Sequence, residues 1–149
     1  MDAERLQTIP LFQGLPQEER SLVAESAREV DVQAGEILTT EGDFGYSFFV
    51  VEAGTATVQE NGREFAELGP GDFFGEIALL VTGRRTASVR STSAMRLITL
   101  FDRDFRRIEA RIPSFSARVR QAMEARRASI APGPSRGRDQ PGLDAGSPP

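Results

Sequence analysis

The sequence predicts a mainly β protein, an antiparallel roll with helices before and after it along the chain. Two observations carry this prediction. Between positions 28 and 101 the chain consists of short β-type runs separated by glycines at turn positions, whereas the flanking segments show apolar residues at helical spacing and prolines at their boundaries. With 149 residues and 39% hydrophobic content, the chain is large enough for one domain with its own core.

The N-terminal lead-in is predicted to contain two helices. The first spans residues 3–8 and ends before Pro10. The second begins at Pro16, because proline suits the first turn of a helix and the acidic residues after it stabilise the positive end of the helix dipole. The Leu11-Phe12 pair between the two helices is expected to pack against the roll.

The roll itself is expected to have eight strands. Asn61-Gly62 predicts a tight hairpin, and closure of the roll on itself would shield its strand edges. The runs with β propensity cover residues 30–32, 36–39, 47–52, 55–59, 64–68, 87–90 and 96–100.

Two helices are predicted after the roll, the first over residues 103–112 with Asp102 as its N-cap. Pro113 interrupts this helix, and a second one follows. We therefore expect one domain over residues 1–130. Residues 131–149 are rich in proline and glycine and are expected to form a disordered tail.

Charge is divided unevenly along the chain, and all 18 basic residues are arginines. Residues 1–82 hold 16 acidic residues and 4 arginines, a net charge of −12, whereas residues 83–149 hold 6 acidic residues and 14 arginines, a net charge of +8. This division indicates either a basic C-terminal surface that meets an anionic partner or two halves whose charges offset each other within one fold. The second explanation is favoured.

Cysteine and histidine are absent, which excludes disulfides, thiol nucleophiles and the usual zinc and iron–sulfur sites. It also disfavours a histidine-ligated barrel metalloenzyme, and the carboxylates show no paired catalytic pattern. We therefore expect a binding protein with no metal and no enzymatic activity. No apolar run reaches the length of a membrane span, and the opening of the chain differs from a secretory signal, so the expected location is cytoplasmic.

The most informative segment runs from Phe74 to Val89. Gly75 lets the backbone pass close to a ligand, and the helical turn expected at residues 76–80 has N–H groups without intrahelical partners, which favour an anion. Glu76 can accept hydrogen bonds from a ribose hydroxyl, while Arg85 offers a planar, permanently charged group to a phosphate. This combination predicts a site for one small cyclic phosphodiester.

The segment resembles the phosphate-binding cassette of the cyclic-nucleotide-binding domain family, found in catabolite-activator-type regulators, in regulatory parts of cyclic-nucleotide-dependent kinases, and in hyperpolarisation-activated and cyclic-nucleotide-gated channels. The likeness includes residues 54–58, 68–76 and 84–90 and extends over about residues 4–130. It implies a stand-alone domain with a double-stranded β-helix (jelly-roll), the cassette helix inserted in it, a helical lead-in and two C-terminal helices.

The resemblance also implies roles for individual residues. A wall facing the purine base is implied at Val58, Ala66 and Leu68, for which plain barrel core is an equal explanation. A lid is implied at Arg126 and Ile130, although a solvated helix face explains Arg126 equally well. The ligand-binding residues implied in the cassette are Gly75, Glu76, Ile77, Ala78, Arg85, Thr86 and Ala87.

The function implied is that of a regulatory module switched by a cyclic purine mononucleotide, through movement of the last helix about a hinge at residues 111–113. Threonine at position 86 accommodates either base in the family; cAMP is favoured, with cGMP as the alternative. A ligand-independent scaffold or interaction module with the same fold is the rival hypothesis. No recognition helix follows Ile130, so sequence-specific DNA binding is not expected, and the effector would be a separate protein or a second copy bound through the C-terminal helix.

Overall fold

The structure is a computed structural model of the 149-residue chain and describes residues 1–130. The tail expected at residues 131–149 lies outside the described residues. The chain divides into two compact units, Met1–Ala117 and Arg118–Pro149. The roll, its lead-in and the cassette all lie in the first unit.

The lead-in contains the two predicted helices and an extra turn: η1 (Ala3–Thr8), η2 (Pro10–Phe12) and α1 (Gln17–Ser26). The first is a 3₁₀ helix, closed by a hydrogen bond from the Ile9 N–H to the Leu6 carbonyl at 3.1 Å. Because Pro10 follows Ile9 directly, the chain is steered away from α geometry at this point.

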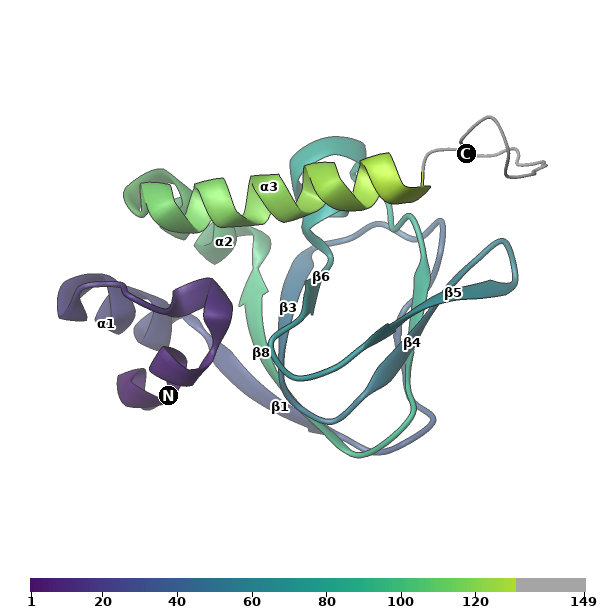
Figure 1. The fold of residues 1–149 in the computed structure, drawn as a ribbon, viewed down its shortest axis with the longest axis horizontal. Coiled ribbons are helices and arrows are strands. Elements are labelled where there is room, and N and C mark those ends of the chain that lie inside the picture. The colour runs from purple at the N-terminus through teal and green to yellow at the C-terminus, as the bar shows by residue number, and fades with distance from the viewer. Residues whose placement is uncertain (131–149) are drawn as a thin grey trace. The chain divides into compact units, whose positions relative to one another are not determined.

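Eight strands within the described residues form two four-stranded sheets, ordered β1-β8-β3-β6 and β2-β7-β4-β5, with every pair antiparallel (Figure 1). Strands distant in sequence are neighbours in both sheets, as a jelly roll requires, so the predicted fold class is confirmed. The strands are β1 (Arg28–Val32), β2 (Ile37–Thr39), β3 (Ser47–Ala53), β4 (Ala56–Glu60), β5 (Arg63–Leu68), β6 (Phe73–Phe74), β7 (Ser88–Ser91) and β8 (Met95–Phe101).

The shortest strand, β6, is the one that shows no β-type run in the sequence. Its two residues pair with β3, with Phe74 opposite Phe49 and Phe73 opposite Val50. Gly71 and Gly75 flank it with φ angles of +93° and +96°, so the chain turns sharply on both sides. Two residues between such turns are too few to show an alternating pattern.

Two apolar clusters hold the first unit together. One lies inside the roll and consists of Val51, Ala56, Val58, Leu68, Phe74, Val89, Met95 and Leu97. The other is aromatic: Phe48 of β3 lies 4.9 Å from Phe105 and 6.1 Å from Phe115 between ring centroids, and Phe12 lies 6.0 Å from Phe115. The aromatic cluster connects the lead-in to the roll through the last helix, because Phe12 stacks on Phe115 and Phe115 contacts Phe48. Leu11 and Phe12 are both buried, and their packing against the roll itself stays a prediction.

After β8 come α2 (Asp102–Arg111) and α3 (Pro113–Ile130), interrupted at Pro113 as predicted. The N-cap prediction was wrong, because Phe101 occupies the N-cap position and makes no side-chain capping bond. Asp102 is instead the first residue of the helix, and its carboxylate accepts a 2.6 Å hydrogen bond from Arg106 one turn later. None of the described helices has the length and apolar character needed to cross a membrane.

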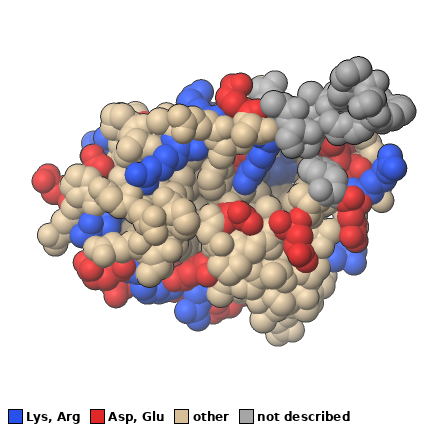
Figure 2. All heavy atoms as spheres, viewed as in Figure 1, with Lys and Arg blue, Asp and Glu red and all other residues tan. Residues whose placement is uncertain are grey.

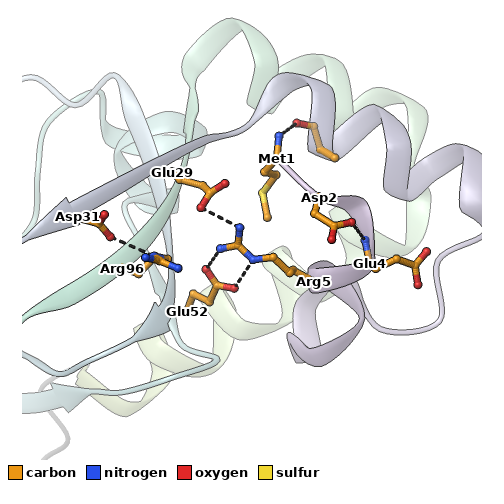
Figure 3. Close-up of polar contacts among 9 residues, drawn as sticks. Met1, Asp2, Glu4, Arg5, Glu29, Asp31, Glu52 and Arg96 are labelled. Carbon is orange, nitrogen blue, oxygen red and sulfur yellow. Dashed lines mark hydrogen bonds and ion pairs between the residues drawn. The ribbon is translucent and has the colours of Figure 1, made fainter.

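The lead-in is attached to the roll by Arg5, which points from η1 toward two carboxylates (Figure 3). Its guanidinium donates to Glu29 of β1 at 2.8 Å, and to both carboxylate oxygens of Glu52 of β3. The two carboxylates raise the pKa of Arg5. Nearby, Arg96 of β8 pairs with Asp31 of β1 at 3.1 Å, so one ion pair links the two oppositely charged halves of the sequence.

Acidic and basic side chains are interspersed on the face of the molecule shown in Figure 2.

Candidate functional site

The cassette is a tight helical turn bounded by two glycines. Gly75 has a φ of +96°, the helical residues begin at Glu76, and η3 (Ala78–Thr82) continues as a π-helical turn. Gly83 ends the turn in the left-handed region, with its N–H donating to the Ala78 carbonyl at 2.8 Å. The helical turn predicted for residues 76–80 is therefore present and extends to Thr82.

The backbone around Arg85 is fixed by the loop that precedes β3. The Arg85 N–H donates to the Asp43 carbonyl at 2.7 Å, and the Gly42 N–H donates to the Arg85 carbonyl at 2.9 Å. The Gly45 N–H donates in the same way to the Gly83 carbonyl at 3.1 Å. Two segments about 40 positions apart in the sequence are thus held together by main-chain hydrogen bonds.

The guanidinium of Arg85 is held by two backbone carbonyl oxygens. Nη2 donates to Ser47 at 2.9 Å and Nη1 donates to Gly75 at 3.4 Å, while the guanidinium carbon lies 5.7 Å from the centre of the Phe49 ring. A Cβ added to Gly75 would lie 2.7 Å from the Ser47 oxygen and 2.8 Å from Nη1 of Arg85. Glycine is therefore needed at position 75 for its backbone angle and for space.

The site brings the buried side chain of Glu76 close to the half-buried guanidinium of Arg85. Glu76 is only 1% exposed. Burial lowers the pKa of Arg85, and the negative charge of Glu76 acts in the opposite direction. Because arginine keeps its proton in proteins, the site holds a partly desolvated, permanent positive charge beside a carboxylate. Such a pair can bind a phosphate and a hydroxyl group that lie next to each other.

Several of the expected base-wall residues lie together in the roll. Val58 pairs with Ala66 and Ala56 pairs with Leu68, so these four side chains share one face of the β4–β5 hairpin. Val58 and Leu68 belong to the cluster inside the roll, and Ala87, two residues after Arg85, packs against it. Ala66 is exposed.

Other expected residues are placed as follows. Thr86 and Ile77 are half-buried and Ala78 is buried. Arg126 lies in the second unit and is half-buried, and for Ile130 the backbone alone is described, at the end of α3. The roles predicted for all these residues stay predictions.

The contribution of residues 42–49 to the site is not indicated by the sequence patterns described above. Gly42, Asp43 and Ser47 supply main-chain partners to Arg85, and the Phe49 ring stacks 4.8 Å from Phe74 while it faces the guanidinium. One signal was available, since two glycines close together before a strand are typical of a loop that approaches another backbone. The described residues contain no group of three or more acidic, histidine or cysteine side chains that could hold a metal ion.

Comparison with known proteins gives consistent matches. The model of the cyclic nucleotide-binding domain family matches residues 29–111. A cAMP-dependent protein kinase regulatory subunit from Hypocrea atroviridis is 32% identical over 115 residues, which are 77% of this chain and 25% of that protein. The chain therefore spans about a quarter of the length of this relative.

Solved structures agree with the match. The catabolite activator protein of Thermus thermophilus has a TM-score of 0.71 and 32% identity, over 82% of this chain and 59% of that one. The regulatory domain of Toxoplasma gondii PKA, solved with cAMP, has a TM-score of 0.63 and 33% identity, over 71% of this chain and 42% of that one. With the family model covering more than half of its residues, the chain belongs to the cyclic nucleotide-binding domain family.

Proposed function

We propose that the cassette binds a cyclic purine mononucleotide, with cAMP favoured over cGMP. The observation that carries the proposal is the placement of the Arg85 guanidinium at the carbonyl of Gly75, beside the buried carboxylate of Glu76. A cyclic nucleotide carries one negative charge on its phosphodiester and a free hydroxyl on its ribose. The site offers one partner of the right kind for each.

In the proposed complex Arg85 neutralises the phosphate. Its guanidinium is half-buried and already oriented by Ser47 and Gly75, so little side-chain entropy is lost on binding. A charge-assisted hydrogen bond in such a partly desolvated site is stronger than the same bond in water. The N–H groups at the start of the cassette helix add further donors for the phosphate.

Glu76 is proposed to accept a hydrogen bond from the ribose hydroxyl, and the purine is proposed to lie against the apolar face of Val58, Ala66 and Leu68. Support for the base position is the shared face of these residues and the packing of Ala87 on the same cluster. The preference for cAMP rests on the relatives, whose names describe cAMP-dependent regulators or a structure solved with cAMP. Thr86 suits either base.

We further propose that the ligand acts on α3, with Arg126 and Ile130 as lid residues. Support comes from the family resemblance and from the helix break, because α2 ends at Arg111 and α3 restarts at Pro113. A ligand shifts such an equilibrium only by its differential affinity for the two states. The signal would pass to a separate effector protein or to a second copy of this chain through α3.

Calorimetric titration of the full chain with cAMP, cGMP and a cyclic dinucleotide tests the binding proposal. We expect saturable binding of the mononucleotides, cAMP the tighter, and a rise in melting temperature, since a ligand at about 100 times its Kd adds about 2.7 kcal/mol to native stability. The absence of heat and of a melting shift with every nucleotide at millimolar concentration would refute it and favour the ligand-independent scaffold. Hydrogen exchange of α3 tests the switch separately: exchange should slow when cAMP is added.

A further inference from the structure

Gly45 is buried in the loop before β3, in direct contact with the cassette. A Cβ added there would lie 2.8 Å from Nε and 2.9 Å from Cζ of Arg85, and 2.6 Å from the Cβ of Ala78 in η3. Real side chains do not approach so closely. The space that a side chain at position 45 would occupy is filled by the guanidinium group of Arg85 and by Ala78 of η3.

The requirement for glycine at this position is one of space and not of backbone angle. Gly45 is absent from the described residues with a positive φ, which include its neighbours Gly42 and Gly75. The strain that a side chain suffers at a positive φ therefore does not arise at position 45. Any effect of a methyl group here comes from what it would touch.

The two backbones that meet at Gly45 have little freedom to move apart. Gly45 is bonded to Gly83, and Arg85 is bonded through its own N–H and carbonyl to Asp43 and Gly42. A methyl group at position 45 would press on the Cβ of Ala78, which can move only together with η3, and on the Arg85 side chain, which is flexible and would be displaced. Displacement of the guanidinium would break its 2.9 Å hydrogen bond to Ser47 and the 3.4 Å bond to Gly75.

We propose that Gly45 is a positioning residue for phosphate recognition, which acts through Arg85 and makes no ligand contact of its own. The inference rests on the proposed function. Its missing Cβ leaves the space in which Nε and Cζ of Arg85 lie, and the carbonyls of Ser47 and Gly75 then fix the direction of the guanidinium. Glycines at positions 45 and 75 thus both leave space for the Arg85 guanidinium, because a Cβ at either position would clash with it.

Gly45→Ala tests this, with Gly69→Ala as the matched control. Gly69 also lacks a positive φ, and a Cβ there would have no neighbour within 4 Å. We expect Gly45→Ala to weaken cAMP binding at least tenfold and Gly69→Ala to change it less than twofold. Because a methyl group at position 45 also crowds Ala78, each affinity is measured at a temperature at which the variant is fully folded. Equal affinity of Gly45→Ala and the unmodified chain would overturn the inference alone, whereas failure of the unmodified chain to bind would overturn the proposed function and the inference together.

A double-mutant cycle separates positioning from a general structural effect. In the Arg85→Ala background, where the guanidinium is gone, we expect Gly45→Ala to cost less than about threefold in affinity, because residues that act as a unit are not additive. An equal cost in both backgrounds would show that the methyl group acts through Ala78 and η3, which would overturn the inference.

A measurement without ligand completes the test. In the unmodified chain, the NMR signals of the Arg85 guanidinium protons, assigned by their loss in Arg85→Ala, should show restricted rotation and slow exchange. They should shift in Gly45→Ala and not in Gly69→Ala. A freely rotating guanidinium in the unmodified chain would overturn the inference even if Gly45→Ala failed to fold.

Discussion

Arg5 and Arg85 are both half-buried, and each joins parts of the chain far apart in sequence, yet their surroundings are opposite. Arg5 is bound by the carboxylates of Glu29 and Glu52, which raise its pKa. Arg85 is bound by the carbonyl oxygens of Ser47 and Gly75, and burial lowers its pKa. One arginine is neutralised by the protein, and the other is oriented without being neutralised by the groups that hold it.

The comparison shows how one residue type serves two purposes. The two carboxylates together carry more charge than Arg5, so the positive charge of Arg5 is fully paired within the protein. The role of Arg5 is therefore to attach η1 to the roll. Carbonyl oxygens carry only partial charge, so they fix the direction of Arg85 while leaving most of its charge for a ligand. The negative charge of the adjacent Glu76 acts on the pKa of Arg85 in the direction opposite to burial.

The largest effect is expected for Arg85→Ala. Removing the charge opposite the phosphate should weaken cAMP binding by about 2–5 kcal/mol, as for the loss of one partner of a buried, hydrogen-bonded charge pair. The melting temperature without ligand should change little. Calorimetry measures the affinity, and Arg84→Ala is the control, because Arg84 is exposed and contacts the Gly42 carbonyl and the Phe44 ring. A loss smaller than about tenfold, or about 1.4 kcal/mol, would place the phosphate elsewhere.

A smaller loss of binding is expected for Glu76→Ala. It removes an acceptor for a neutral hydroxyl, so cAMP should bind about 1–2 kcal/mol more weakly. The comparison of cAMP with its 2′-deoxy analogue measures this contact directly: the two should differ in affinity for the unmodified chain and bind equally to Glu76→Ala. An undiminished difference in the variant would show that another group holds the ribose hydroxyl.

Arg5→Ala should lower the stability of the fold and leave cAMP binding unchanged, the opposite of what is expected for Arg85→Ala. We expect a loss of about 1 kcal/mol of unfolding free energy, since a bidentate pair in a small network exceeds an isolated surface ion pair but remains partly exposed. Thermal unfolding with and without 0.5 M salt checks the electrostatic origin, and cAMP affinity should stay within about twofold. A tenfold loss of affinity would mean that attachment of η1 is coupled to the site.

The smallest effect, a slight gain in stability, is expected for replacement of Glu60, whose carboxylate lies near that of Glu41. Burial, and then the charge of Glu41, raise the pKa of Glu60, which lies opposite Arg63 in the β4–β5 hairpin. A raised pKa means that ionisation of Glu60 opposes folding: its favourable contribution is complete below the ordinary glutamate pKa of about 4.3 and is lost as the pH rises through the folded value. Glu60→Gln should therefore raise the free energy of unfolding slightly at pH 7, by about 0.5 kcal/mol or less, and leave it unchanged at pH 4, as measured by thermal unfolding at the two pH values.

A rise in stability of the same size at both pH values would show that Glu60 acts through packing or hydrogen bonding and not through its charge.

Local sequence patterns predict the fold class, two of the three lead-in helices, both C-terminal helices, seven of the eight strands and the order of the cassette. Alternation, helical spacing, prolines and glycines are properties of neighbouring residues, and the run from Gly75 to Ala87 is short enough to be recognised as a unit. The N-cap prediction was wrong because the carboxylate of Asp102 accepts a hydrogen bond from Arg106, one turn away, and does not cap a backbone N–H.

Only the tertiary structure decided what holds Arg85 and Arg5. Arg85 meets Ser47 across 38 positions of sequence and Arg5 meets Glu52 across 47, and no local pattern specifies such contacts. The clearance at Gly45 and the two-residue strand β6 likewise exist only because distant backbones are brought together by closure of the roll. The chemistry available to the site therefore follows from its residue types, whereas the direction of the half-buried Arg85 guanidinium is set by packing between segments that are remote in the chain.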